Sequence, residues 1–288
     1  MTFYSEEMIN KIKSLETAPR VYESVFSQSE INELIRLEEE SVGLRMVDRV
    51  DSRKTAIDWQ SQVKDIIADK IESCLGHKIF VGDFPAHFIR NRFPLRIHAD
   101  MGKDPTLLPY KNVLLPLYVK GGGTTHTILF KQKWYGKSSL FSANGDSKSS
   151  DHFFKDMNGD FVHIKNSQEL LHKMKSNIDQ QINYEGGVFF CSMENIEEIE
   201  ALLKQSRYSD RTNNHITSDR PFDKVLYKKY LSHQPYEDLK GLEIDVAMPW
   251  RPGDIITFNR STIHCASNFL QEGVEEKMAI AMFTIWEE

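Results

Sequence analysis

The hydrophobic periodicity of the chain changes near residue 78, and this change limits the folds open to it. Before that point apolar residues recur every three to four positions, which is typical of amphipathic helices. After it they alternate with polar residues, as in strands with one buried face. The sequence therefore predicts helices first and a mainly β core after them. The predicted helices cover residues 5–16, 29–40 and 58–76.

The predicted strands lie in two blocks, 77–136 and 241–288, separated by a polar segment. Residues 137–240 are rich in Ser, Asn, Asp and Lys. Because a structureless loop of that length is uncommon inside a compact domain, we interpret this segment as an insertion with its own helices, forming a lid or a substrate-binding region. Helical patterns within it cover residues 166–178 and 194–205.

The expected fold class is α+β with a mainly β core, in one domain that spans residues 1–288. Residues 1–76 would form a helical layer on that core. A chain of 288 residues with 40% hydrophobic residues is long enough to bury a core of this size.

Charge and cysteine usage exclude several classes of function. The formal net charge is −6, so the chain has no basic surplus with which to bind long nucleic acids. Cys74, Cys191 and Cys265 are widely separated and form no C-x-x-C pair, which indicates a reducing compartment. Neither a signal peptide nor a membrane-spanning run is evident. We expect a cytoplasmic protein with no membrane partner; the sequence leaves its oligomeric state open.

The stretch "RFPLRIHADMGKDP" contains the first candidate site residues, His98 and Asp100. Alternation in a strand points residues two apart to the same side. Alone, this H-x-D pair is equally consistent with an ion pair on a loop. A third candidate is His264 in "WRPGDIITFNRSTIHCASNF", where a turn precedes a short strand. A histidine in that position can face His98 across a barrel.

Two neutral imidazoles and one carboxylate on one face of Fe(II) leave adjacent positions open for a bidentate cosubstrate and O₂. A structural zinc site would need a fourth Cys or His close to one of these residues. Neither segment supplies such a ligand pair at the usual zinc spacing. The combination therefore favours a facial metal triad of His98, Asp100 and His264.

The sequence resembles the Fe(II)/2-oxoglutarate-dependent dioxygenases of the phytanoyl-CoA and prolyl hydroxylase type. The resemblance rests on "HAD" as the family's H-x-D, on "PGDIITFNRSTIHCASN" as the segment of the distal histidine, and on "VYESVFSQSEINELIRLEE" as the N-terminal strand and helix. It covers about residues 20–130 and 245–288. The segment between them resembles nothing in the family and explains the long separation of the two histidines.

The resemblance implies a double-stranded β-helix, or jelly roll, that binds Fe(II), 2-oxoglutarate and O₂. It implies hydroxylation of an unactivated C–H bond in a small-molecule or amino-acid-like substrate, with release of succinate and CO₂. The far carboxylate of 2-oxoglutarate would be held by Lys277, at the start of the last strand. Members often have Arg followed by Ser two residues later, whereas this chain has Lys277 and Ala279. Lysine offers a point charge instead of a planar fork.

Other residues are weaker candidates for cosubstrate binding. Arg96 and Arg260 are alternative carboxylate partners, and Tyr118 and Asn268 could also reach the cosubstrate. His126 could lie next to the metal ligands or be an ordinary structural histidine. Two other functions stay open. One is a cupin-like barrel that uses a metal for isomerisation or for cosubstrate-free dioxygenation. The other is a non-catalytic jelly-roll binding protein.

Overall fold

In the computed structural model of the chain, the N-terminal helices begin and end at residues that cap them. Ser5 caps the first helix, and Ser27 forms a capping box with Glu30 at the second. The third ends at Gly76, whose φ of 78° is left-handed and therefore suits glycine. It begins later than predicted because Asp58 accepts the Gln60 N–H in a turn. These helices are α1 (Glu6–Ser14), α2 (Gln28–Glu40) and α3 (Gln62–Leu75), and the 3-10 helix η1 (Val42–Leu44) follows α2.

The structure describes residues 4–48, 52–102, 104–136, 138–142, 152–155, 157, 161–164, 167–184, 187–194, 196–197, 208–210, 218 and 220–287. The chain divides into two compact units. The larger contains Met1–Leu140 and Thr212–Glu288, and the smaller contains Phe141–Arg211.

The larger unit contains two antiparallel sheets. One has the order β1-β15-β6-β17-β4-β3-β2, and the other runs β8-β5-β16-β7-β14. The strands are β1 (Arg20–Tyr22), β2 (Arg45–Asp48), β3 (Ser52–Ala56), β4 (Phe80–Asn91), β5 (His98–Ala99), β6 (Pro109–Gly121), β7 (His126–Lys133), β8 (Ser139–Ser142), β14 (Ile244–Pro249), β15 (Ile255–Asn259), β16 (Thr262–Ala266) and β17 (Val274–Ile285).

The strand order identifies the architecture. Successive strands β4, β5, β6 and β7 alternate between the two sheets, and β14, β15, β16 and β17 do the same. The last strand therefore lies between the first and the third, and β16 lies between β5 and β7. This is the topology of a jelly roll, or double-stranded β-helix. The predicted mainly β core with a helical N-terminal layer is confirmed.

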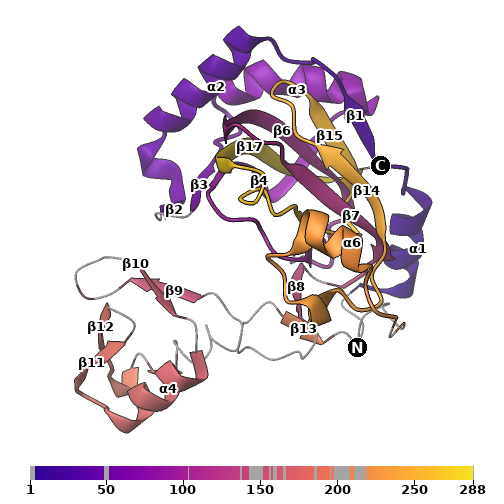
Figure 1. Cartoon of the computed structure of the whole chain (residues 1–288). Helices are drawn as coiled ribbons and strands as arrows, with labels where there is room; N and C mark the ends of the chain where they lie inside the picture. Colours follow the sequence, from indigo (N-terminus) through magenta and orange to yellow (C-terminus); the bar gives the residue numbers. More distant parts are fainter. Residues whose placement is uncertain are drawn as a thin grey trace. The chain divides into compact units, whose positions relative to one another are not determined.

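Helices α2 and α3 cover one face of the seven-stranded sheet (Figure 1). Their buried residues, such as Leu34 and Ile67, belong to the same core cluster as Leu115 of β6 and Ile280 of β17. The other face of this sheet looks into the barrel, where Leu129, Ile256 and their neighbours form a separate cluster. Alternate residues of β6, β15 and β17 therefore face either the helices or the barrel interior.

A short helical segment precedes β14 in the larger unit. It consists of α6 (Lys224–Leu226), the π-helix η4 (Tyr227–Leu231) and the 3-10 helix η5 (Tyr236–Leu239). The side chain of Asp223 caps α6 by accepting the N–H groups of Val225 and Leu226. Strand β14 follows this segment and lies within the block 241–288 that was predicted to form strands.

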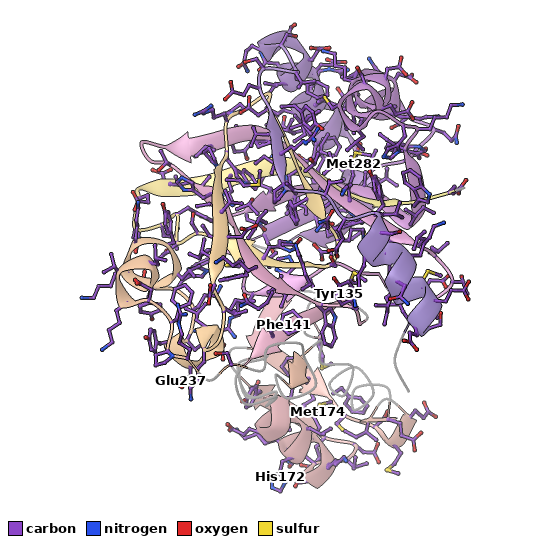
Figure 2. All side chains as sticks on the ribbon, turned by 90° about the vertical axis from the view of Figure 1, so that its right-hand side faces the viewer. Tyr135, Phe141, His172, Met174, Glu237 and Met282 are labelled. Atoms are coloured by element: carbon purple, nitrogen blue, oxygen red, sulfur yellow. The ribbon has the colours of Figure 1, made fainter. Side chains whose placement is uncertain are left out.

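The smaller unit has its own core, in which Leu170, Met174 and Cys191 are almost fully buried. Met174 and His172 are labelled on its helix in Figure 2. The helix matches the pattern predicted for 166–178, whereas the one predicted for 194–205 lies largely outside the described residues. That this segment forms a lid stays a prediction. Its elements are α4 (Ser167–Ser176), β9 (His152–Lys155), β10 (Phe161–Ile164), β11 (Gln181–Tyr184), β12 (Gly187–Phe190) and β13 (Tyr208–Asp210). In the described part of the whole chain, no helix has the length and apolar character needed to cross a membrane.

The carboxylate of Glu38 links α2 to the sheet. It is 1% exposed, accepts a hydrogen bond from Thr55 at 2.9 Å, and lies 3.0 Å from the guanidinium of Arg90. Removing one partner of a buried ion pair leaves the other without compensation. This interaction therefore ties the helical layer to β3 and β4.

We predict that Glu38→Ala lowers the free energy of unfolding by about 3 kcal/mol, the lower end of the range for buried pairs, because Arg90 is partly exposed. Urea denaturation followed by circular dichroism would measure the loss. Glu39→Ala is the matched control, since Glu39 is 61% exposed and lies 3.7 Å from the same arginine. Equal stability of the two variants would contradict the prediction.

Candidate metal centre

The three predicted metal ligands meet inside the barrel. His98 begins β5, and Asp100 follows that strand directly. The β5–β16 pairing places His98 opposite His264, and their ring centroids are 4.0 Å apart. One potential ligand atom from each of His98, Asp100 and His264 lies within 4.8 Å of the others. The structure thus brings together two segments that are far apart in the sequence.

Backbone carbonyls fix the orientation of both imidazoles. Nδ1 of His98 lies 2.7 Å from the carbonyl oxygen of Arg96, and Nδ1 of His264 lies 2.9 Å from that of Thr262. A carbonyl only accepts hydrogen bonds, so Nδ1 is the protonated nitrogen in each neutral ring. The Nε2 lone pairs are then available to a metal. They lie 3.6 Å and 3.2 Å from Oδ2 of Asp100.

The electrostatic environment keeps Asp100 ionised. Burial raises the pKa of this carboxyl, but its neighbours His98, His264 and Arg260 outweigh burial and hold the pKa below its usual range. A carboxylate that stays ionised at neutral pH is the form that binds a cation. Two imidazoles and one carboxylate, with no fourth protein ligand among the described residues, form the donor set of a facial non-haem iron site. The residues present therefore fit Fe(II).

Arg260 supports the backbone beneath Asp100. Its Nε donates to the carbonyl oxygen of Asp100 at 2.6 Å, and a terminal nitrogen donates to that of Thr284 at 3.1 Å. Burial lowers the pKa of Arg260 to about 10, so the guanidinium remains charged at neutral pH. Because it already donates to these two carbonyls, Arg260 serves to position Asp100.

Lys277 lies in the barrel wall with its ammonium surrounded by apolar and aromatic groups. It is 3% exposed, and Nζ lies 3.8 Å from the ring centroid of Trp250 and 4.9 Å from that of Phe269. Nζ donates a hydrogen bond to Oγ1 of Thr125 at 3.2 Å. Burial lowers the pKa of Lys277 to about 7. No described carboxylate lies within salt-bridge distance of Nζ, so this buried cation is suited to an anionic ligand.

The strand face that carries Lys277 also carries Ala279 and Ala281, both buried. These residues pair with Ile89 and His87 of β4. The two side chains that follow Lys277 on this face are therefore small.

The other predicted cosubstrate residues lie elsewhere. Tyr118 packs against the helix-covered cluster and donates a hydrogen bond to Glu276. Asn268 donates to Ser232 at 2.8 Å in a turn that holds the helical segment before β14. Arg96 contributes its carbonyl oxygen to His98 and is partly buried. The structure therefore groups Arg96 with the triad through its backbone and separates Tyr118 and Asn268 from it.

Several residues of the site were missed in the sequence. Trp250 and Phe269 surround Lys277, and Phe258 places its ring 4.7 Å from that of His264. Asn112 lies 3.5 Å from Oδ2 of Asp100. Phe258 shares a strand face with Ile256, so alternation could have indicated that it points into the barrel. Nothing local marks Trp250 or Asn112, because their roles depend on strands paired far along the chain.

Comparisons with known proteins give weak similarity only. Neither a known sequence family nor a curated protein matches the chain. Among solved structures, the nogalamycin-biosynthesis protein SnoK, described as a non-heme alpha ketoglutarate dependent carbocyclase, is 13% identical with a TM-score of 0.44, over 99% of this chain and 86% of its own. A collagen prolyl hydroxylase of Paramecium Bursaria Chlorella virus-1, solved with 2OG, is 11% identical with a TM-score of 0.39, over 94% and 97%.

HygX of Streptomyces hygroscopicus, with nickel and 2-oxoglutarate bound, is 15% identical with a TM-score of 0.37, over 98% of this chain and 86% of its own. Identities and TM-scores this low transfer no activity or ligand to this chain. The jelly roll is assigned from the strand order described above, and the metal site from its own geometry.

We predict that His264→Ala weakens Co(II) or Fe(II) binding by more than about 100-fold while the fold is retained, because one of three ligands is lost and no described residue replaces it. Equilibrium dialysis under anaerobic conditions measures the affinity, and circular dichroism checks the fold. His172→Ala, at an exposed position of α4, should bind metal like the wild type. Wild-type metal affinity in His264→Ala would contradict the assignment of His264 as a metal ligand.

We also predict that Lys277→Met stabilises the ligand-free protein. The folded-state pKa of about 7 lies below the ordinary value near 10.5, so burial disfavours the charged form. This penalty is complete below pH 7 and disappears as the pH approaches 10.5. The stability difference between the variant and the wild type, measured by urea unfolding, should therefore narrow as pH rises from 7 to 10. A difference that is constant with pH would show that Lys277 is not a desolvated cation.

Proposed function

We propose that this protein is an Fe(II)- and 2-oxoglutarate-dependent oxygenase that hydroxylates an unactivated C–H bond of a small-molecule or amino-acid-like substrate. The observation that carries the proposal is the combination, inside one barrel, of the His98–Asp100–His264 triad with a buried lysine that forms no ion pair with any described carboxylate. The triad offers ligands for the metal. Lys277 offers the charge that a dicarboxylate needs at its other end.

When bound, the iron would activate O₂ and couple conversion of 2-oxoglutarate to succinate and CO₂ with insertion of an oxygen atom into a C–H bond. His98, Asp100 and His264 would hold the metal on one face and leave the opposite positions to cosubstrate and O₂. Halogenating enzymes of this class leave the carboxylate position vacant for chloride. In this chain Asp100 fills it, which favours hydroxylation.

The roles of the remaining residues follow from their contacts. The backbone carbonyls of Arg96 and Thr262 hold the two imidazoles in the tautomer that presents Nε2. Arg260 holds the peptide that carries the Asp100 side chain. Lys277, with Thr125 beside it, would bind the far carboxylate of 2-oxoglutarate. The rings of Trp250 and Phe269 keep water from this ammonium and so strengthen its attraction for an anion.

The proposal is tested by anaerobic titration of the Fe(II)-loaded protein with 2-oxoglutarate, followed by the visible absorption of the iron site. We predict that Lys277→Ala weakens 2-oxoglutarate binding by about 30-fold or more, corresponding to the roughly 2–5 kcal/mol lost when a buried charge loses its partner. Iron affinity should change little, because Lys277 is not among the ligands of the triad.

The pH dependence of the same titration provides a second check. Only the ammonium form of Lys277 attracts the carboxylate, and its pKa of about 7 means that this form is depleted above neutrality. The apparent Kd of the wild type should therefore rise by up to about tenfold per pH unit above 7. Lys277→Arg should show weaker but pH-independent binding, because an arginine remains charged in proteins.

The control variant Arg96→Ala tests whether Arg96, instead of Lys277, binds the far carboxylate of 2-oxoglutarate. If binding weakens in this variant and not in Lys277→Ala, Arg96 holds the cosubstrate. No spectral change with 2-oxoglutarate in the iron-loaded wild type would overturn the cosubstrate and favour a cupin-like, cosubstrate-free metal enzyme. Failure of the wild type to retain iron would instead favour a non-catalytic jelly-roll binding protein.

A further inference from the structure

Asn112 lies on the wall of the barrel that faces the triad. It is 2% exposed on β6, and its strand partners are Phe258 of β15 and Phe283 of β17. Residues paired across antiparallel strands point to the same face. The ring of Phe258 contacts His264, so the face shared by these three residues is the face of the metal centre. The amide of Asn112 is thus flanked by two aromatic side chains.

The orientation of this amide follows from its neighbour. Nδ2 of Asn112 lies 3.5 Å from Oδ2 of Asp100. The oxygen and nitrogen of an asparagine amide are assigned from their partners, and an ionised carboxylate only accepts hydrogen bonds. The NH₂ group must therefore face Asp100. The same Oδ2 atom is the one that faces the Nε2 atoms of both histidines.

This orientation leaves the amide oxygen pointing away from the carboxylate. Oδ1 of Asn112 is buried, and no described residue donates a hydrogen bond to it. The neighbouring rings of Phe258 and Phe283 have no polar group to offer. A buried carbonyl without a donor destabilises a folded chain, so an apolar side chain of this size would suit the ligand-free protein better. The presence of an asparagine at this buried position is explained if both Nδ2 and Oδ1 have hydrogen-bond partners when the site holds a metal.

We infer that Asn112 is a positioning residue with two partners. Its NH₂ group holds the Asp100 oxygen that faces the histidines, which limits rotation of the carboxylate and favours metal binding. Its Oδ1 accepts a hydrogen bond from a water molecule held beside the metal position. This inference rests on the proposed function only for the presence of a metal at the triad, and it needs neither 2-oxoglutarate nor a known substrate.

The test uses the full chain loaded with Co(II), whose visible absorption reports the number and geometry of its ligands. In Asn112→Leu, the Co(II) dissociation constant should rise by about 10-fold or more, as is typical when a residue that orients a metal ligand is removed. The Co(II) absorption bands should also shift in position or intensity. The melting temperature of the metal-free variant should equal or exceed that of the wild type, because a buried unpaired oxygen has been removed.

This pair of results separates positioning from a merely structural role. Asn259→Ala is the matched control: Asn259 is also buried, on the neighbouring strand, but its amide already bonds Lys111 and the backbone of Thr17. That variant should lose thermal stability and keep the wild-type Co(II) spectrum. A fall in melting temperature in Asn112→Leu, with Co(II) affinity and spectrum unchanged, would overturn the inference. If the leucine does not fit, Asn112→Ala, which only removes atoms, gives the same Co(II) affinity and absorption readings.

The water partner is tested by a crystal structure of the Co(II)-loaded wild type without substrate. An oxygen atom about 2.7–3.2 Å from Oδ1 of Asn112 is expected. An ordered site without one would overturn that part of the inference. A wild type that binds no Co(II) would overturn the metal centre and the proposed function together. Normal Co(II) binding by the wild type with no response to 2-oxoglutarate would overturn the cosubstrate and leave the role of Asn112 intact.

Discussion

The candidate metal centre depends on a very short antiparallel pairing, in which His98 of β5 lies opposite His264 of β16. Strand β5 has only two residues, so this contact needs support from its neighbours. Strand β8 pairs with its other edge, and Arg260 binds the carbonyl of Asp100 immediately after it. The imidazoles are then oriented by carbonyls of their own strands. Backbone pairing and backbone carbonyls therefore fix the positions and orientations of the three candidate ligand side chains.

Two buried cations, Arg260 and Lys277, have different roles in the barrel. Burial lowers the pKa of each, but the guanidinium starts from a higher value and stays charged at pH 7. Arg260 is bound to backbone carbonyls and so forms part of the scaffold. Lys277 has aromatic rings and a hydroxyl around it, and no carboxylate among the described residues. The charge of Arg260, which persists at neutral pH, positions Asp100, whereas the charge of Lys277, which titrates near neutrality, is the one proposed to bind an anion.

The sequence predicted the triad because His98 and Asp100 are close together in the chain, and because the segment around His264 resembles that of the family's distal histidine. Two residues separated by one position in a strand point the same way, so His98 and Asp100 could be paired from the sequence alone. The sequence alone did not decide which face of its strand Tyr118 occupies. The β6–β17 register shifts between Met278 and Ala279, and Tyr118 pairs with Met278, a residue of the helix-covered cluster. A β-bulge turns the side chains beyond it to the other face of the sheet, and no short sequence pattern indicates where such a bulge occurs.

The sequence by itself determined the helical layer, the mainly β core and the residue types able to bind a metal, because periodicity, capping and side-chain chemistry are local properties. Tertiary structure alone decided that His264 faces His98, that Lys277 is buried among aromatic rings, and that the amide of Asn112 meets Asp100. These outcomes depend on which distant strands pair and in what register. The pKa of Lys277 depends on the burial that this pairing creates, since an exposed lysine would keep its ordinary value.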